Sequence, residues 1–172
     1  PIADELRALR EYGQTEKYEH ERIGYNSRLD TLQAAVLDVK LDYLDEWNEE
    51  RRHAASLYAE QLADLPLKTP SIPEWGDHVF HLFVVETGDE SERAALQEHL
   101  DDVGVSTGIH YPIPVHKQPS YRNLPWDFND QPVTERVARR ILSLPIYPEI
   151  TAEQVAYVAS SIRSFYGAAN HS

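Results

Sequence analysis

The 172-residue chain contains no cysteine and no methionine. Without cysteine it has no disulfide framework, no thiol catalysis and no thiolate metal site. Because there is also no signal-peptide pattern, we expect a cytoplasmic protein. Without methionine the chain begins at Pro1 with no initiator, and we expect it to be a piece of a longer polypeptide. No apolar run approaches the roughly 18 residues needed to cross a bilayer, so we expect no membrane partner.

Basic residues are also scarce, with 16 Lys and Arg against 29 Asp and Glu, for a formal net charge of −13. Nucleic acids and anionic membrane surfaces attract basic patches, so this balance argues against both as partners. A halophilic source and a generally acidic surface explain the acidity equally well. A small phosphorylated ligand stays compatible with the sequence, since a few arginines can dominate one pocket.

The apolar pattern predicts an α/β (α+β) fold. Residues 4–11 favour a short helix that ends at Gly13, and residues 30–65 repeat with helical spacing, with a change of phase near Asp45 that indicates two helices or a kink. Prolines then form a linker. The remaining expected elements are strand Val79–Glu86, helix Ser91–Val103, strand Val105–Tyr111, helix Pro132–Arg140, strand Ile141–Leu144 and helix Thr151–Tyr166.

This order predicts a long helical arm followed by a small, mostly antiparallel sheet covered by helices. The arm needs a partner surface, either a domain outside this chain or a second subunit. We therefore expect Asp30–Leu62 to expose an apolar face when this chain is considered alone.

The segment Gly24–Ala35 places Asn26 and Arg28 just before a helix start. Asp30 and Gln33 form a variant of the capping box that satisfies free N–H groups there. Free N–H groups and the helix dipole also favour an anion at this position. Helix capping and a surface ion pair explain the same residues without a ligand.

The eight histidines invite a metal-binding interpretation. His78 and His81 would point to opposite faces of a strand, and the sequence has no HExxH motif. We therefore expect no metal site.

Two of the other histidines belong to a proline-rich segment, Gly108–His116. It ends a predicted strand with His110, Tyr111 and His116, and its prolines hold the backbone in one shape. Local chemistry alone favours a rigid surface turn with incidental histidines over a binding loop.

Six stretches together resemble the C-terminal part of the DegT-like nucleotide-sugar aminotransferases, a branch of the fold-type I pyridoxal-phosphate (PLP) enzymes. They follow the family's order along nearly the whole chain: Leu9–Gln14, Gly24–Ala35, Trp47–Tyr58, His78–Val85, Gly108–Tyr121 and Leu142–Pro148. The segments Thr107–His116 and Gln118–Tyr121 look most like members that act on dTDP-linked keto sugars.

The resemblance implies reversible amino transfer from an amino acid, usually glutamate, to a nucleotide-linked keto sugar, with PLP bound as a Schiff base to a lysine. That lysine lies upstream in the family, so this chain alone is expected to be inactive. The resemblance also implies a homodimer, in which Asn26 reaches the PLP phosphate of the neighbouring subunit and Arg28 supports the same anion site. His110, Tyr111 and His116 would face the nucleotide-sugar.

In the family's architecture, residues 1–29 would end the large domain and carry an active-site loop. Residues 30–65 would be the connecting helices, and residues 66–172 the C-terminal small domain. Two other functions stay open at this point: a PLP-dependent sugar dehydratase of the same family, and a non-catalytic dimerisation or binding module.

Overall fold

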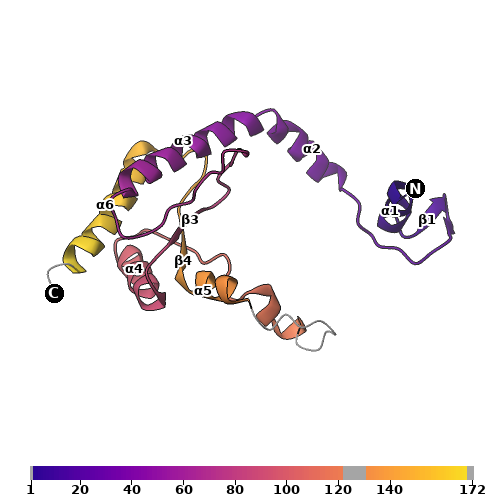
Figure 1. The fold of residues 1–172 in the computed structure, drawn as a ribbon. Helices are drawn as coiled ribbons and strands as arrows, with labels where there is room; N and C mark the ends of the chain where they lie inside the picture. Colours follow the sequence, from indigo (N-terminus) through magenta and orange to yellow (C-terminus); the bar gives the residue numbers. More distant parts are fainter. Residues whose placement is uncertain (1, 122–130, 170–172) are drawn as a thin grey trace. The chain divides into compact units, whose positions relative to one another are not determined.

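The structure is a computed structural model that describes residues 2–121 and 131–169 (Figure 1). It divides into two compact units, Pro1–Leu44 and Asp45–Ser172. Within the described residues, no helix has both the length and the apolar character required to cross a membrane.

The first unit begins with helix α1, Ile2–Arg10, and a small hairpin of β1, Gln14–Glu16, and β2, Glu19–His20. The helix ends as predicted because Tyr12 and Gly13 adopt left-handed conformations, with φ of 61° and 76°. The Gly13 N–H then donates to the Ala8 carbonyl at 2.8 Å and closes the last turn.

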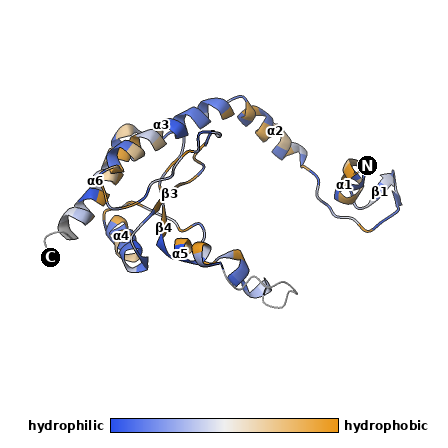
Figure 2. Cartoon of the chain, in the orientation of Figure 1, coloured by the Kyte–Doolittle hydropathy of each residue, from blue (hydrophilic) through white to orange (hydrophobic). Residues whose placement is uncertain are grey.

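The unit ends with helix α2, Thr31–Leu41, which buries none of its residues. Asp30 caps it as predicted, since its carboxylate accepts from the Leu32 N–H at 2.9 Å. Leu32, Val36 and Val39 lie at helical spacing and are 79%, 59% and 62% exposed. Hydrophobic residues along α2 are visible in Figure 2. The predicted apolar face is confirmed for this helix.

Helix α3, Leu44–Leu62, follows after a break at residues 42–43, which confirms the predicted division of the helical region. Here the expectation of an exposed apolar face is wrong. Ala54, Ala55, Tyr58 and Leu62 are buried in the core of the second unit, so this chain's own elements cover the second half of the arm.

The core of the second unit surrounds an antiparallel pair of strands, β3, Phe83–Glu86, and β4, Ile141–Leu144. Phe83 lies opposite Leu144 and Val85 opposite Leu142, and these four side chains face the core. The other elements of the unit are α4 (Glu90–Asp102), η1 (Val115–Lys117), η2 (Pro119–Tyr121), α5 (Pro132–Arg140) and α6 (Ala152–Ala169). The prediction of a small antiparallel sheet covered by helices is confirmed.

Two predicted strands need correction. Val105–Tyr111 is not a strand; only Gly108 pairs with β4, through an isolated bridge to Ser143. The strand predicted over Val79–Glu86 begins only at Phe83. Phe80 has a φ of 48°, and its N–H donates to Nδ1 of His78 at 2.8 Å. This local side-chain bond competes with a strand ladder and delays the start of the strand.

Candidate functional site

The Gly24–Arg28 segment is fixed against the end of α1 by backbone hydrogen bonds. Three of these bonds join Tyr12 N to Tyr25 O (2.9 Å), Tyr25 N to Leu9 O (2.6 Å) and Ser27 N to Arg10 O (2.9 Å). An isolated antiparallel bridge also pairs Asn26 with Glu11. Asn26 and Arg28 are therefore carried by a backbone of defined course, although both side chains are exposed.

Two glycines make this close packing of backbones feasible. A Cβ atom on Gly24 would lie 2.0 Å from the Gly13 nitrogen and 2.7 Å from the Leu9 carbonyl oxygen. A Cβ atom on Gly13 would lie 1.8 Å from the Arg22 carbonyl oxygen. All three distances are far below contact, so only glycine fits at either position.

A polar cavity of about 440 Å³ opens beside this segment, at the N-terminal end of α2. Its lining residues are Tyr12, Asn26, Arg28, Leu29, Asp30 and Thr31. The amide of Asn26, the guanidinium of Arg28 and the hydroxyl of Thr31 are all hydrogen-bond donors suited to an oxyanion. The cavity joins both sequence-predicted anion-binding residues with the end of the helix that favours negative charge.

His110 lies where the proline loop, residues 108–121, meets β4. Its Nδ1 is 2.9 Å from the Ser143 hydroxyl. The Gly108 and Ser143 backbones exchange two hydrogen bonds, of 3.1 Å and 2.7 Å. The Tyr111 ring meets the His110 ring edge-on at 5.7 Å and is 74% exposed.

His116 contacts a different element from His110, since its partner belongs to α5 and not to β4. Its side chain is only 9% exposed, and its Nε2 is 3.1 Å from Glu135 of α5, which Lys117 also contacts at 3.1 Å. Hydrogen bonds from His116 and then from Lys117 hold the pKa of the Glu135 carboxyl below its usual value. These contacts fasten the proline loop to α5.

A largely apolar cavity of about 660 Å³ lies between the proline loop and α5. Its lining residues are His110, Tyr111, Ile113, Pro114, Val115, Gln118, Val133, Thr134, Val137, Ala138 and Ile141. The structure thus brings His110 and Tyr111 to one cavity. His116 belongs to the same loop but contacts Glu135 and does not line this cavity.

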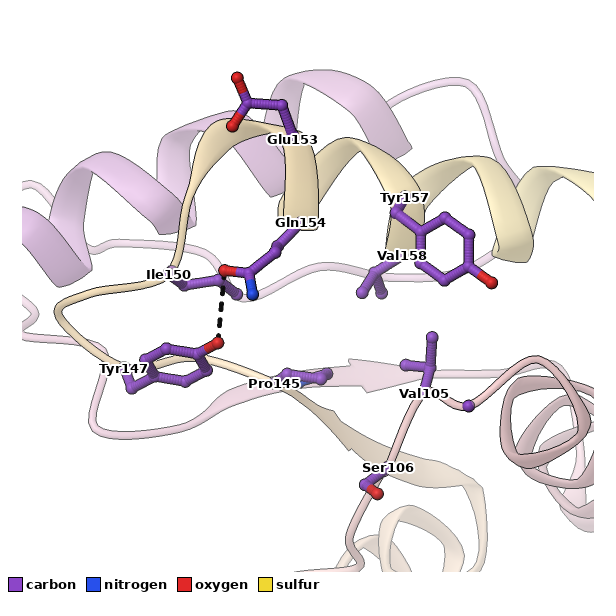
Figure 3. A pocket seen from close by; sticks show the side chains of 10 residues that line it. Val105, Ser106, Pro145, Tyr147, Ile150, Glu153, Gln154, Tyr157 and Val158 are labelled. Carbon is purple, nitrogen blue, oxygen red and sulfur yellow. Dashed lines mark hydrogen bonds between the residues drawn. The ribbon is translucent and has the colours of Figure 1, made fainter.

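A further cavity of about 470 Å³ lies between residues 104–106 and the start of α6 (Figure 3). Tyr147 and Gln154 both line this cavity, and the Tyr147 hydroxyl donates to the Gln154 side-chain oxygen at 3.3 Å. None of the sequence-predicted site residues lines this cavity. Among the described residues there is also no group of three or more side chains that could hold a metal ion.

Sequence reasoning missed Tyr12, Ser143 and Glu135. Tyr12 precedes the glycine that ends α1, and its backbone turn brings it beside Asn26. Ser143 is the one hydroxyl in the strand Ile141–Leu144. Because strand side chains alternate, a serine between two core leucines must face away from the core, and this signal was available.

Comparisons with known proteins place the chain among sugar aminotransferases. Residues 1–163 match the family model described as the DegT/DnrJ/EryC1/StrS aminotransferase family. The erythromycin biosynthesis sensory transduction protein EryC1 of Saccharopolyspora erythraea is 44% identical over 164 residues. A dTDP-3-amino-3,6-dideoxy-alpha-D-galactopyranose transaminase of Aneurinibacillus thermoaerophilus is 40% identical over the same length. Each match covers 95% of this chain and 44% of the relative.

The fold is similar to that of solved members. The crystal structure of DesV from S. venezuelae, in complex with a ketimine intermediate, superposes with a TM-score of 0.88 at 42% identity. The match covers 96% of this chain and 44% of that chain. The chain therefore spans less than half the length of these relatives.

Proposed function

The chain belongs to the DegT/DnrJ/EryC1/StrS aminotransferase family, and we propose that it forms the C-terminal part of a PLP-dependent sugar aminotransferase. In this proposal the longer protein transfers the amino group of an amino acid, glutamate, to the carbonyl carbon of a dTDP-linked keto-deoxysugar. Glutamate leaves as 2-oxoglutarate. The match over residues 1–163, together with the donor-lined cavity at Asn26 and Arg28, carries the proposal.

The residues of this cavity fit the phosphate group of PLP. A phosphate ester needs several N–H and O–H donors and a compensating positive charge, and Asn26, Arg28, Thr31 and the start of α2 supply them. The only carboxylate in the lining, Asp30, accepts from the Leu32 N–H as a helix cap. When bound, PLP supplies the electron-withdrawing ring that makes amino transfer feasible. This chain's own contribution is to bind and orient the phosphate.

The proline loop is proposed to bind the nucleotide-sugar. His110 and Tyr111 offer an imidazole and a phenol to sugar hydroxyls or the diphosphate, at the edge of an apolar cavity that excludes water from the bound ligand. His116 supports this site by holding the loop on Glu135.

We further propose a cytoplasmic homodimer that shares its active sites between subunits. The exposed apolar residues of α2 support this assignment, since monomeric proteins rarely leave such a face uncovered. In this arrangement residues 1–29 close the large domain, residues 30–65 connect, and residues 66–172 form the small domain.

The proposal is tested by expressing the longer polypeptide and the 172-residue chain separately. Each is incubated with PLP, glutamate and a dTDP-linked keto sugar, and mass spectrometry follows the aminated product. The longer polypeptide should form product, whereas the 172-residue chain alone should not. Product formation by the 172-residue chain, or none by the longer polypeptide with any keto-sugar nucleotide, would contradict the proposal.

Replacing Arg28 by alanine in the longer polypeptide tests the cofactor site. A charge-assisted hydrogen bond contributes about 1.5–3 kcal/mol, so the dissociation constant for PLP should rise roughly tenfold to a hundredfold. Arg7→Ala is the matched control, because it removes the same charge from the same unit, and Arg7 pairs with the exposed Asp4 and does not line the cavity. Equal affinities of the two variants would exclude Arg28 from the phosphate site.

A further inference from the structure

Ser143 is a buried polar residue whose role the proposed function does not yet include. The residue is 5% exposed and lies on β4 opposite Val84, between the core residues Leu142 and Leu144. A hydroxyl at such a position needs a hydrogen-bond partner, since an unpaired buried hydroxyl is costly. The partner is Nδ1 of His110, at 2.9 Å.

The His110 ring is fixed from two sides. The backbone bridge between Gly108 and Ser143 holds the start of the proline loop at a constant distance from β4. The ring then lies over Gly108: a Cβ atom there would approach the His110 Cε1 to 2.8 Å. The missing side chain at Gly108 therefore makes room for the imidazole, and the Ser143 hydroxyl sets its rotation.

We propose that Ser143 is a positioning residue for ligand binding by His110. With Nδ1 engaged by Ser143, the ring has one nitrogen, Nε2, to offer to a ligand of the 660 Å³ cavity that His110 lines. A serine hydroxyl can donate to Nδ1 or accept from it, so the contact fixes the direction of the ring in either tautomer. Ser143 thus sets the direction in which His110 presents Nε2. The ligand identity, a nucleotide-sugar, rests on the proposed function.

The positioning itself is tested without any activity, by nuclear magnetic resonance of the ¹⁵N-labelled 172-residue chain. A nuclear Overhauser contact between the His110 Hε1 proton and the Gly108 Hα protons should be seen in the unsubstituted chain, because the ring lies over Gly108. Ser143→Ala should weaken this contact by freeing the ring, and Ser143→Thr, which keeps the hydroxyl, should restore it. Gly108→Ala should displace the ring and shift the His110 ring signals.

Ser161→Ala is the matched control. Ser161 is also a buried serine, but its hydroxyl donates to the Tyr157 carbonyl within α6. This variant should leave the His110 signals unchanged. Absence of the His110–Gly108 contact in the unsubstituted chain, or an unchanged contact in folded Ser143→Ala, would overturn the positioning role.

The link to ligand binding is tested in the longer polypeptide. Losing one ordinary hydrogen bond should raise KM for the nucleotide-sugar about threefold to tenfold in Ser143→Ala, with little change in kcat. Ser143→Ala should add nothing in a His110→Ala background, whereas a purely structural role would add the same loss in both. Additive losses overturn the proposal. An enzyme without transaminase activity refutes the proposed function alone, because the resonance result stands independently.

Discussion

Replacing Tyr58 by phenylalanine removes a single hydroxyl from the centre of the second unit. The Tyr58 side chain is fully buried, and its ring stacks on Phe83 with centroids 5.0 Å apart. Its hydroxyl donates to the Pro145 carbonyl at 2.9 Å and so ties α3 to the residue that follows β4. Tyr58→Phe keeps the ring and its packing but leaves that carbonyl without this donor.

The cost follows from hydrogen-bond energetics. A typical internal hydrogen bond stabilises by about 0.5–1.5 kcal/mol, and an unpaired buried acceptor costs about 1–3 kcal/mol. We therefore expect Tyr58→Phe to lower the free energy of unfolding at pH 7 by about 1–2 kcal/mol. For a domain of this size that corresponds to a decrease in Tm of roughly 3–6 °C.

The same burial makes this difference depend on pH. Burial, and secondly the nearby Tyr147, raise the pKa of Tyr58 above its ordinary value. The unfolded chain releases the Tyr58 proton near pH 10 while the folded chain keeps it. Stability is therefore lost above about pH 10, by about 1.4 kcal/mol per pH unit. Tyr58→Phe removes this loss, so its disadvantage at pH 7 should largely disappear at pH 11.

Tryptophan fluorescence during urea unfolding reports the second unit selectively, because all three tryptophans lie between positions 47 and 126. Tyr157→Phe is the matched control: its hydroxyl also donates to a carbonyl, that of Val103 at 2.9 Å, but its side chain is 53% exposed. The control should change stability by less than about 0.5 kcal/mol. A Tyr58→Phe deficit that stays constant from pH 7 to pH 11 would refute the burial argument.

Three further predictions concern the candidate sites and α2. Gly24→Ala should abolish hydrogen-exchange protection of the Gly24–Arg28 backbone, whereas Gly167→Ala, where an added Cβ meets nothing within 4 Å, should not. Hydrogen bonds lower the pKa of Glu135, so its contact with His116 should stabilise the proline loop above the usual glutamate pKa and weaken as the pH falls through the lowered pKa. Amide exchange of the loop between pH 3 and pH 6 measures this dependence, and Glu135→Gln should remove it. Leu32→Ser should change the free energy of unfolding by less than about 0.5 kcal/mol, because Leu32 is exposed, yet weaken dimerisation of the longer polypeptide in analytical ultracentrifugation.

The sequence predicted those elements whose local signals agree with their packing. Helical spacing with a cap at Asp30 predicted α2. The interruption between α2 and α3 was visible as a change of phase near Asp45. The strand β4 was predicted over its observed residues because Pro145 ends it. At two of these boundaries a single residue supplies the signal, since Asp30 caps the helix and Pro145 cannot continue the strand.

Long-range pairing could not be predicted in the same way. The alternation of Val105–Tyr111 is that of a strand, but only Gly108 reaches β4, and Val105 alone among these residues is buried. The predicted site residues were similarly incomplete. Asn26 and Arg28 come from one segment and meet in one cavity, whereas the partner of His110 lies 33 residues away. A partner at that separation is identified only by the folded chain.

The two isolated bridges beside the sheet have a consequence for solubility. On the outer edge of β3, Lys68 and Glu86 exchange two backbone hydrogen bonds of 2.9 Å, and on the outer edge of β4 Gly108 and Ser143 exchange two of 3.1 Å and 2.7 Å. Each strand has only four residues, so one such bridge occupies much of its free edge. An open strand edge is a template for pairing with another chain. The bridges therefore protect this small sheet from edge-to-edge aggregation, without adding a third strand.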